Sequence, residues 1–314
     1  MAPERGIDIL FATHNGARTL PRMLAALRQL EPPRRPWRVI AVDNASTDAT
    51  PELLRDAAAD LAITVLHCPV PGKEQALKVG AAAVQGDLVL LTDDDVEPVP
   101  GWLKIYEEAA DSMEEIGLFG GPIVPTPIEG VLPWFEASRD HHAELFASSD
   151  HPDGPVNAVA SIYGPNYLIR RAYLDVFDYH SGLGPTFAEG KSRTYPMGED
   201  TMVMELLTRR GAAARYVRGA AVKHLVRTFQ TDLDFMLRRA QRHGRGAAIR
   251  LAQRGQRPLM RRLKFLASQL PHIFHRPGLA AQPPSPERFN ALWDAHWSRG
   301  ACIGAAFGPY PDRD

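Results

Sequence analysis

The chain has 314 residues, of which 45% are hydrophobic, and a formal net charge of −1. It can bury one large core, or a main domain with an appendage, and no apolar run approaches the roughly 18 residues of a membrane-spanning helix. Cys68 and Cys302 are too few for a disulfide framework or, by themselves, for a zinc site. Because the amino terminus lacks the regions of a signal peptide, we expect a cytoplasmic protein.

The first half of the chain alternates between strand and helix patterns. Thr50 followed by Pro51 is a strong helix-start signal, because proline is favoured at the first helical position. Strands separated by helix-length patterns predict a parallel, doubly wound α/β sheet. The predicted strands are 7–12, 37–42, 63–66 and 88–91, and the predicted helices are about 19–30, 50 onward and 75–84.

Three consecutive acids follow the fourth strand. The continuous apolar run 88–91 predicts a strand buried on both faces. Asp93 and Asp95 should then share one face at its carboxyl end, with Asp94 on the other. Two carboxylates on one face suit a divalent cation that carries phosphate oxygens. An acidic turn that caps a helix beginning near Pro100 is the alternative.

Polar residues also follow the first two strands. Thr13 and Asn15 come after the first, and Asp43 and Asn44 after the second. In a parallel sheet these strand ends lie side by side, so we expect the three clusters to converge on one crevice. The first turn lacks both the GxGxxG pattern and the glycine-lysine phosphate loop, which predicts a nucleotide site built from side chains.

Beyond Pro100 the pattern changes. Prolines between 122 and 133 predict extended or looped chain, and 182–198 predicts a loop. We expect helices at 134–146 and 201–210, short strands at 167–169, 214–217 and 220–224, and helical chain after 232.

The carboxyl-terminal third is strongly basic. Between Glu205 and Arg276 there are 17 Lys and Arg, against only Glu205, Asp232 and Asp234. This charge suggests phosphate-rich ligands or an anionic membrane surface, and no nucleic acid is expected because no nucleic-acid motif accompanies it. An apolar stripe within 259–274 beside Arg261 predicts either an interfacial helix at the inner membrane surface or a helix packed on the catalytic domain.

Four motifs occur in the order and spacing typical of family 2 glycosyltransferases, and the chain resembles that family over about residues 7–223, less clearly to 246. They are ATHN (12–15), VDNASTD (42–48), GKEQALKVG (72–80) and LTDDDVEP (91–98). The resemblance implies the GT-A (Rossmann-like) nucleotide-diphospho-sugar transferase fold, with a mostly parallel central sheet. The family usually has Asn where this chain has Lys78; Lys78 could approach a phosphate or be a solvated helix residue.

The resemblance also implies roles for the donor-side residues. Asp43 would accept a hydrogen bond from the base, with Thr13 and Asn15 near the base and ribose. Asp93 would hold the ribose or sugar, and Asp95 would hold Mn²⁺ or Mg²⁺ on the diphosphate. His224 corresponds to the family's late metal-binding histidine. The full nucleotide-sugar-binding set is Thr13, Asn15, Asp43, Asn44, Lys73, Lys78, Asp93, Asp94 and Asp95.

Other segments resemble the acceptor side of the family. The sequence MGEDT (197–201) resembles its Glu-Asp motif, so Asp200 is the predicted general base and Glu199 an acceptor or orienting contact, although a helix cap is the alternative. Asn166 could touch the acceptor sugar or form a turn. The basic segment 238–245 could supply cations to the diphosphate or be a solvated or lipid-facing surface. His141, His142 and Trp134 are further acceptor-side candidates that a core or surface helix would also explain.

We therefore predict an inverting, metal-dependent glycosyltransferase with a UDP-sugar as the favoured donor and a sugar, lipid-linked or small-molecule acceptor. A nucleotidylyltransferase of similar fold, or a non-catalytic nucleotide-sugar-binding relative at the membrane, are the alternatives. The predicted domains are a catalytic domain at 1–228, with nucleotide-sugar and acceptor halves at 1–100 and 101–228, and a basic helical region at 229–314.

Overall fold

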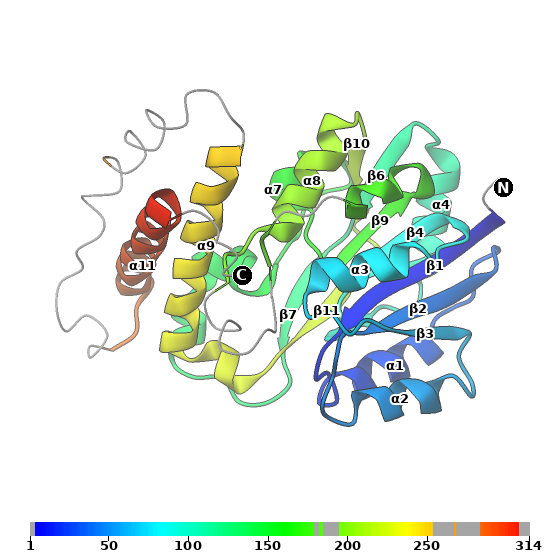
Figure 1. The fold of residues 1–314 in the computed structure, drawn as a ribbon, viewed down its shortest axis with the longest axis horizontal. Coiled ribbons are helices and arrows are strands. Elements are labelled where there is room, and N and C mark those ends of the chain that lie inside the picture. Colours follow the sequence, from blue (N-terminus) through cyan, green and yellow to red (C-terminus); the bar gives the residue numbers. More distant parts are fainter. Residues whose placement is uncertain (1–3, 179–181, 185–194, 254–266, 268–282, 308–314) are drawn as a thin grey trace. The chain divides into compact units, whose positions relative to one another are not determined.

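The computed structural model describes residues 4–178, 182–184, 195–253, 267 and 283–307 (Figure 1). These residues fall into two compact units, which are described separately. The first unit is Met1–Thr126, Ala147–His180 and Asp200–Leu225, and the second is Pro127–Phe146, Ser181–Glu199 and Val226–Asp314. The predicted boundary at 228 is close to the observed one at 225. Two segments within the predicted catalytic range, 127–146 and 181–199, belong instead to the unit with the carboxyl-terminal helices.

An eight-stranded sheet forms the first unit, in the order β3-β2-β1-β4-β9-β6-β10-β8. The first four strands in this order pair in parallel, β9 runs antiparallel to both neighbours, and β10 is parallel to β6. The predicted parallel, doubly wound half is therefore confirmed. The strands are β1 (Glu4–Thr13), β2 (Trp37–Asp43), β3 (Ile63–His67), β4 (Gly86–Thr92), β6 (Ile116–Gly120), β8 (Gly154–Pro155), β9 (Asn166–Arg170) and β10 (Ala213–Tyr216).

Helices cover both faces of this sheet. Alternate residues of β1 face opposite sides, so Ile7, Ile9 and Phe11 pack in a core with α1, α2 and α4, whereas Leu10 packs with α3 and α8. Figure 1 shows α1 and α2 on one side of β1–β3 and α3 on the other. The helices are α1 (Leu20–Arg28), α2 (Thr50–Ala57), α3 (Lys73–Ala81), α4 (Trp102–Ser112), α7 (Ala158–Ser161), η2 (Arg171–Asp178) and α8 (Glu199–Arg209), whose first residue belongs to the second unit.

A small second sheet has the order β5-β11-β7. Its strands are β5 (Val96–Pro98), β7 (Ile123–Pro127) and β11 (Val222–Val226). β5 and β11 run antiparallel, with Val96 opposite His224. This register brings the end of the acidic run next to the predicted histidine ligand, although Asp95 and His224 are 129 positions apart in the sequence.

The second unit is helical around an aromatic core. Its largest helices, α9 (Leu233–Gln253) and α11 (Pro286–Phe307), lie side by side (Figure 1). The contact depends on glycines, because a Cβ at Gly244 would overlap a main-chain oxygen of α11 and one at Gly300 would overlap a main-chain oxygen of α9. The predicted helix at 134–146 is broken into three short helices. These are α5 (Trp134–Ala137), η1 (Arg139–His141) and α6 (His142–Phe146); η3 (Thr228–Thr231) precedes α9.

The predicted interfacial helix at 259–274 lies outside the described residues, apart from residue 267. Among the helices that the structure does describe, none combines the length and apolar character required to cross a bilayer.

Candidate functional site

Backbone and side-chain hydrogen bonds tie the end of β1 to the end of β2. The Asn44 amide donates to the Thr13 carbonyl (2.8 Å), and His14 Nδ1 donates to the Asn44 carbonyl (2.7 Å). Asn15, in the left-handed region at φ 54°, accepts from the Thr47 amide (2.8 Å). The two polar turns therefore form one rigid rim at the carboxyl edge of the sheet, as the sequence predicts for parallel strands.

Asp43 is 5% exposed and stands at the end of β2. It accepts from the Ser46 amide (3.2 Å) and from Nδ1 of His67 (3.1 Å), which ends β3. Together with Pro51 and Arg55 of α2, these two side chains line a cavity of about 420 Å³. His67 is a site residue that sequence reasoning missed; its position at the end of the next parallel strand is the signal that could have found it.

The Asn44 side chain organises the loop before α3. Its amide group donates to the carbonyls of Cys68 (3.0 Å) and Val70 (2.7 Å), and its oxygen accepts from the Gly72 amide (2.8 Å). Gly72 has φ +141°, which favours glycine, and α3 begins at the next residue, Lys73. The buried Asn44 side chain thus fixes the loop that places Lys73 at the sheet edge.

Lys73 joins the acidic run to the predicted base. Its Nζ lies 2.7 Å from Asp93 and 3.9 Å from Asp200, at the start of α8. Burial raises the pKa of Asp93; Lys73 opposes this rise, and the nearby carboxylates of Asp95 and Asp200 add to it. Residues from α3, the end of β4 and α8 therefore form one compact charged cluster.

Asp95 stands beside the predicted histidine. His224 Nε2 lies 3.4 Å from Asp95 Oδ1, and the Leu225 amide donates to the Asp95 carbonyl (2.8 Å). Asp94 instead contacts the Thr13 hydroxyl at the end of β1. The three acids thus have three different partners. In the described part of the chain, no group of three or more His, Cys, Asp or Glu is placed to hold a metal ion by itself.

Asp200 packs closely on the main chain of the predicted acceptor segment 163–166. A Cβ at Gly164 would overlap the Asp200 carboxylate, so glycine allows this approach. Beside it, burial raises the pKa of Tyr167 well above its usual range, and the Asp200 carboxylate adds to the rise. In the second unit, the preceding residue, Glu199, accepts from the Gly198 amide (3.1 Å).

The structure gives Asn166 a different place from the one predicted. Its side chain is fully buried, accepts from Trp102 Nε1 and Tyr106 OH (both 2.9 Å), and donates to the carbonyls of Pro122 (3.0 Å) and Ala220 (2.7 Å). All four hydrogen-bonding positions of the amide are used in the core. The residue holds α4 and the segments that precede β7 and β11 to β9, and has no capacity left for an acceptor sugar.

Four other predicted site residues pair with or pack against side chains of their own unit. Lys78 Nζ pairs with Asp178 (3.4 Å) on η2 rather than with the Asp93 cluster. In the second unit, His141 stacks on Trp293 (4.3 Å between ring centroids). The other two pack on aromatic side chains of the same unit, as a core helix would place them: Trp134 packs on Phe289 and His142 packs on Phe135.

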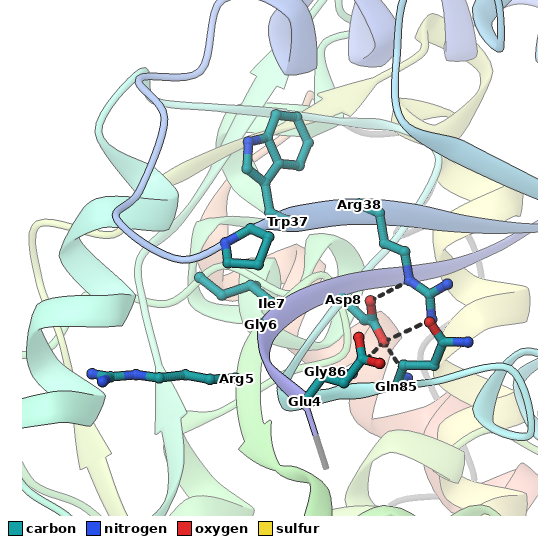
Figure 2. A pocket seen from close by; sticks show the side chains of 10 residues that line it. Glu4, Arg5, Gly6, Ile7, Asp8, Trp37, Arg38, Gln85 and Gly86 are labelled. Carbon is teal, nitrogen blue, oxygen red and sulfur yellow. Dashed lines mark hydrogen bonds and ion pairs between the residues drawn. The ribbon is translucent and has the colours of Figure 1, made fainter.

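A separate cavity of about 110 Å³ lies at the amino ends of β1, β2 and β4 (Figure 2). Asp8 is one of its lining residues, and its carboxylate already accepts hydrogen bonds from Arg38 Nε (2.7 Å) and from the amides of Gln85 (2.6 Å) and Gly86 (2.9 Å). In parallel sheets ligands bind at the opposite, carboxyl edge. This cavity is therefore part of the framework, and the polar cluster lies at the other ends of the strands.

The mixed sheet, covered on both faces and with its polar cluster at the carboxyl edge, defines the GT-A class of glycosyltransferase folds. A mannosyltransferase from Pyrobaculum calidifontis, solved with GDP-mannose and Mn²⁺, has this fold; it is 20% identical, with a TM-score of 0.58 over 100% of this chain and 90% of that one. Residues 8–174 match the model of glycosyl transferase family 2. The chain belongs to glycosyl transferase family 2.

Two curated relatives share parts of the sequence. An undecaprenyl-phosphate 4-deoxy-4-formamido-L-arabinose transferase from Pectobacterium carotovorum subsp. carotovorum is 31% identical over 121 residues, which are 36% of each chain. A glucosyl-dolichyl phosphate glucuronosyltransferase from Haloferax volcanii is 22% identical over 210 residues, 64% of this chain and 63% of that protein. The chain thus spans about a third of the length of the first relative and less than two thirds of the second.

Proposed function

We propose that this protein transfers a sugar, with inversion, from a nucleotide-diphosphate donor to an acceptor hydroxyl. The observation that carries the proposal is the position of Lys73, which contacts Asp93 on the donor side and lies within ion-pair distance of Asp200. Family membership, which the match over residues 8–174 establishes, supports nucleotide-sugar chemistry at this edge. A UDP-sugar is the favoured donor.

The rim of β1 and β2 would bind the nucleoside. A carboxylate accepts hydrogen bonds only, so Asp43 suits the N–H of a pyrimidine or purine base. Its bond from His67 requires a hydrogen on Nδ1 of the imidazole, so any further hydrogen bond of the ring would be made by Nε2. Thr13 and Asn15 lie on the same rim and would border the base and ribose.

Asp95 and His224 would hold Mn²⁺ or Mg²⁺. Two neighbouring ligands of one octahedral ion stand about 3 Å apart, and the 3.4 Å between His224 Nε2 and Asp95 Oδ1 fits such a pair. Two protein ligands leave the other positions for diphosphate oxygens and water, which is the usual arrangement of ions that bind with nucleotide phosphates. When bound, the ion would neutralise charge that develops on the leaving diphosphate.

Asp200 would act as general base. Its carboxylate would take the proton of the acceptor hydroxyl as the oxygen attacks the anomeric carbon, and the nucleoside diphosphate would leave on the opposite side. One displacement of this kind inverts the anomeric centre, and no covalent enzyme intermediate is required. Lys73 would hold the ionised forms of Asp93 and Asp200 in place through charge attraction.

A sugar carried on a polyprenyl phosphate, which offers the hydroxyl that the proposed base requires, is the acceptor class that we favour, with the protein at a membrane surface. The support is chemical analogy: the names of both curated relatives contain a polyprenyl phosphate. The excess of Lys and Arg between 205 and 276 would suit such an anionic acceptor.

A thermal-shift screen tests the donor side of this function. The protein is heated with UDP, GDP, UDP-glucose, UDP-N-acetylglucosamine or GDP-mannose, each with and without Mn²⁺. A ligand at 100 times its Kd stabilises the native state by about 2.7 kcal/mol, a rise of roughly 5 °C in Tm. We expect this rise with a uridine nucleotide and Mn²⁺ together. Identical melting curves under all conditions would contradict the proposal.

A further inference from the structure

The segment that precedes Asp200 is attached to the backbone of α9 within the second unit. The Met197 amide donates to the Arg242 carbonyl (3.1 Å), and Arg250 Nη1 donates to the Met197 carbonyl (3.2 Å). The Arg242 guanidinium also lies over the Tyr195 ring, 4.8 Å from its centroid. Both polar groups of the Met197 main chain are therefore held by residues of one helix.

Glycines on both sides make this close contact feasible. A Cβ at Gly246 of α9 would overlap the Met197 carbonyl, so any other residue would push the segment away from the helix. Gly198 has φ +118°, and a Cβ there would overlap the Arg250 guanidinium. The segment thus reaches Glu199 in a backbone conformation that favours glycine and that α9 stabilises.

Several arginines of α9 make contacts inside the second unit. Burial lowers the pKa of Arg242, whose guanidinium lies over the Tyr195 ring. Arg245 is only 6% exposed, and Arg239 Nε donates to the Glu144 carbonyl (3.0 Å) within the same unit. Within 238–245, Arg239 therefore holds a main-chain carbonyl and Arg242 packs on an aromatic ring, which differs from both alternatives that the sequence left open.

We propose that Gly246 and Arg250 are positioning residues for the general base, an inference that rests on the proposed function of Asp200. Asp200 follows Glu199 directly, so the conformation of 197–199 sets where α8 begins and where the carboxylate points. Neither Gly246 nor Arg250 needs to touch the donor or the acceptor. Their effect on transfer passes through the main chain of 197–199.

The test compares two alanine substitutions in the same helix. Gly246→Ala places a methyl group against Met197, whereas the control Gly244→Ala places one against the Trp297 carbonyl of α11. Both raise helix propensity equally and both crowd a main-chain oxygen. Hydrogen exchange in the peptide covering 195–200 should become about fivefold faster in Gly246→Ala, since one hydrogen bond is lost, and should not change in Gly244→Ala.

Turnover provides the second readout, with UDP-glucose or UDP-N-acetylglucosamine as donor, whichever stabilises more, and a glucosyl polyprenyl phosphate, which carries free hydroxyls, as acceptor. Gly246→Ala should lower kcat by about 10²-fold, the loss expected from a displacement of about 1 Å, with donor KM within about twofold of wild type. Arg250→Met should lower kcat in the same direction, and Arg250→Lys should restore part of it because Lys can also donate to the Met197 carbonyl.

Failure of the proposed base and failure of the positioning role would give different results. If Asp200→Asn keeps full turnover, the assignment of the base is wrong. If Asp200→Asn loses turnover while Gly246→Ala and Gly244→Ala have equal kcat and equal exchange at 195–200, only the positioning role is overturned. A donor KM that rises in step with the fall in kcat would also overturn it.

Discussion

Asp200→Asn is expected to lower transfer by about 10²–10⁴-fold, the usual contribution of a general base. The amide has nearly the shape of the carboxylate but cannot take a proton from an attacking hydroxyl. It also keeps an oxygen that can face Lys73, which lies 3.9 Å away in the wild type. Binding of a uridine nucleotide with Mn²⁺ should therefore change little, so kcat falls while the thermal shift persists.

The matched control for this variant is Asp178→Asn on η2. It removes the same charge from a carboxylate whose partner is Lys78 (3.4 Å), away from the Asp93 cluster. Initial rates of UDP release at saturating donor and acceptor are compared for both proteins. Wild-type turnover in Asp200→Asn would remove this residue as the base, and an equal loss in both variants would show that the effect is not specific to the site.

Asp95→Ala should abolish the rise in Tm that UDP and Mn²⁺ produce together. Without this carboxylate only His224 remains of the proposed pair, and a single neutral imidazole binds a hard divalent ion weakly because such ions prefer anionic oxygen ligands. His224→Ala should also reduce this rise in Tm, but less than Asp95→Ala does, because the remaining Asp95 still attracts the cation.

Chelation supplies the control for these two variants. Excess EDTA should reduce the response of the wild type to that of Asp95→Ala, and Asp178→Ala should respond as the wild type does. If Asp95→Ala kept the full Mn²⁺-dependent rise, the ion would have to bind elsewhere. If Asp95→Ala melted far below the wild type even without ligand, the His224→Ala variant would carry the test.

The parallel half of the fold was predictable because its signals are local. A continuous apolar run followed by acids identified β4 and its carboxyl edge, and Pro51 marked the start of α2. Convergence of Thr13, Asp43 and Asp93 at one edge then follows from parallel strand direction alone. β6 was missed, because Gly117 and Gly120 interrupt the apolar pattern of a strand that is only five residues long.

Features that depend on distant partners were not predictable from the sequence. Asparagine is common at sugar-binding sites, so the sequence suggested such a role for Asn166. Only the hydrogen bonds that it accepts from Trp102 and Tyr106 reveal that it belongs to the core. The link from Asn44 through a loop to Lys73 requires the loop conformation, which no periodic pattern encodes. Gly246 looks like an unfavourable residue inside a helix until Met197 is seen against it.

The most direct test of the account is anomalous diffraction from crystals of the protein grown with UDP and Mn²⁺. We predict one manganese peak within bonding distance of both Asp95 and His224, with the diphosphate as a further ligand and the uracil beside Asp43. A manganese peak away from these two side chains, or a nucleotide bound at the amino ends of the strands, would contradict the proposed site.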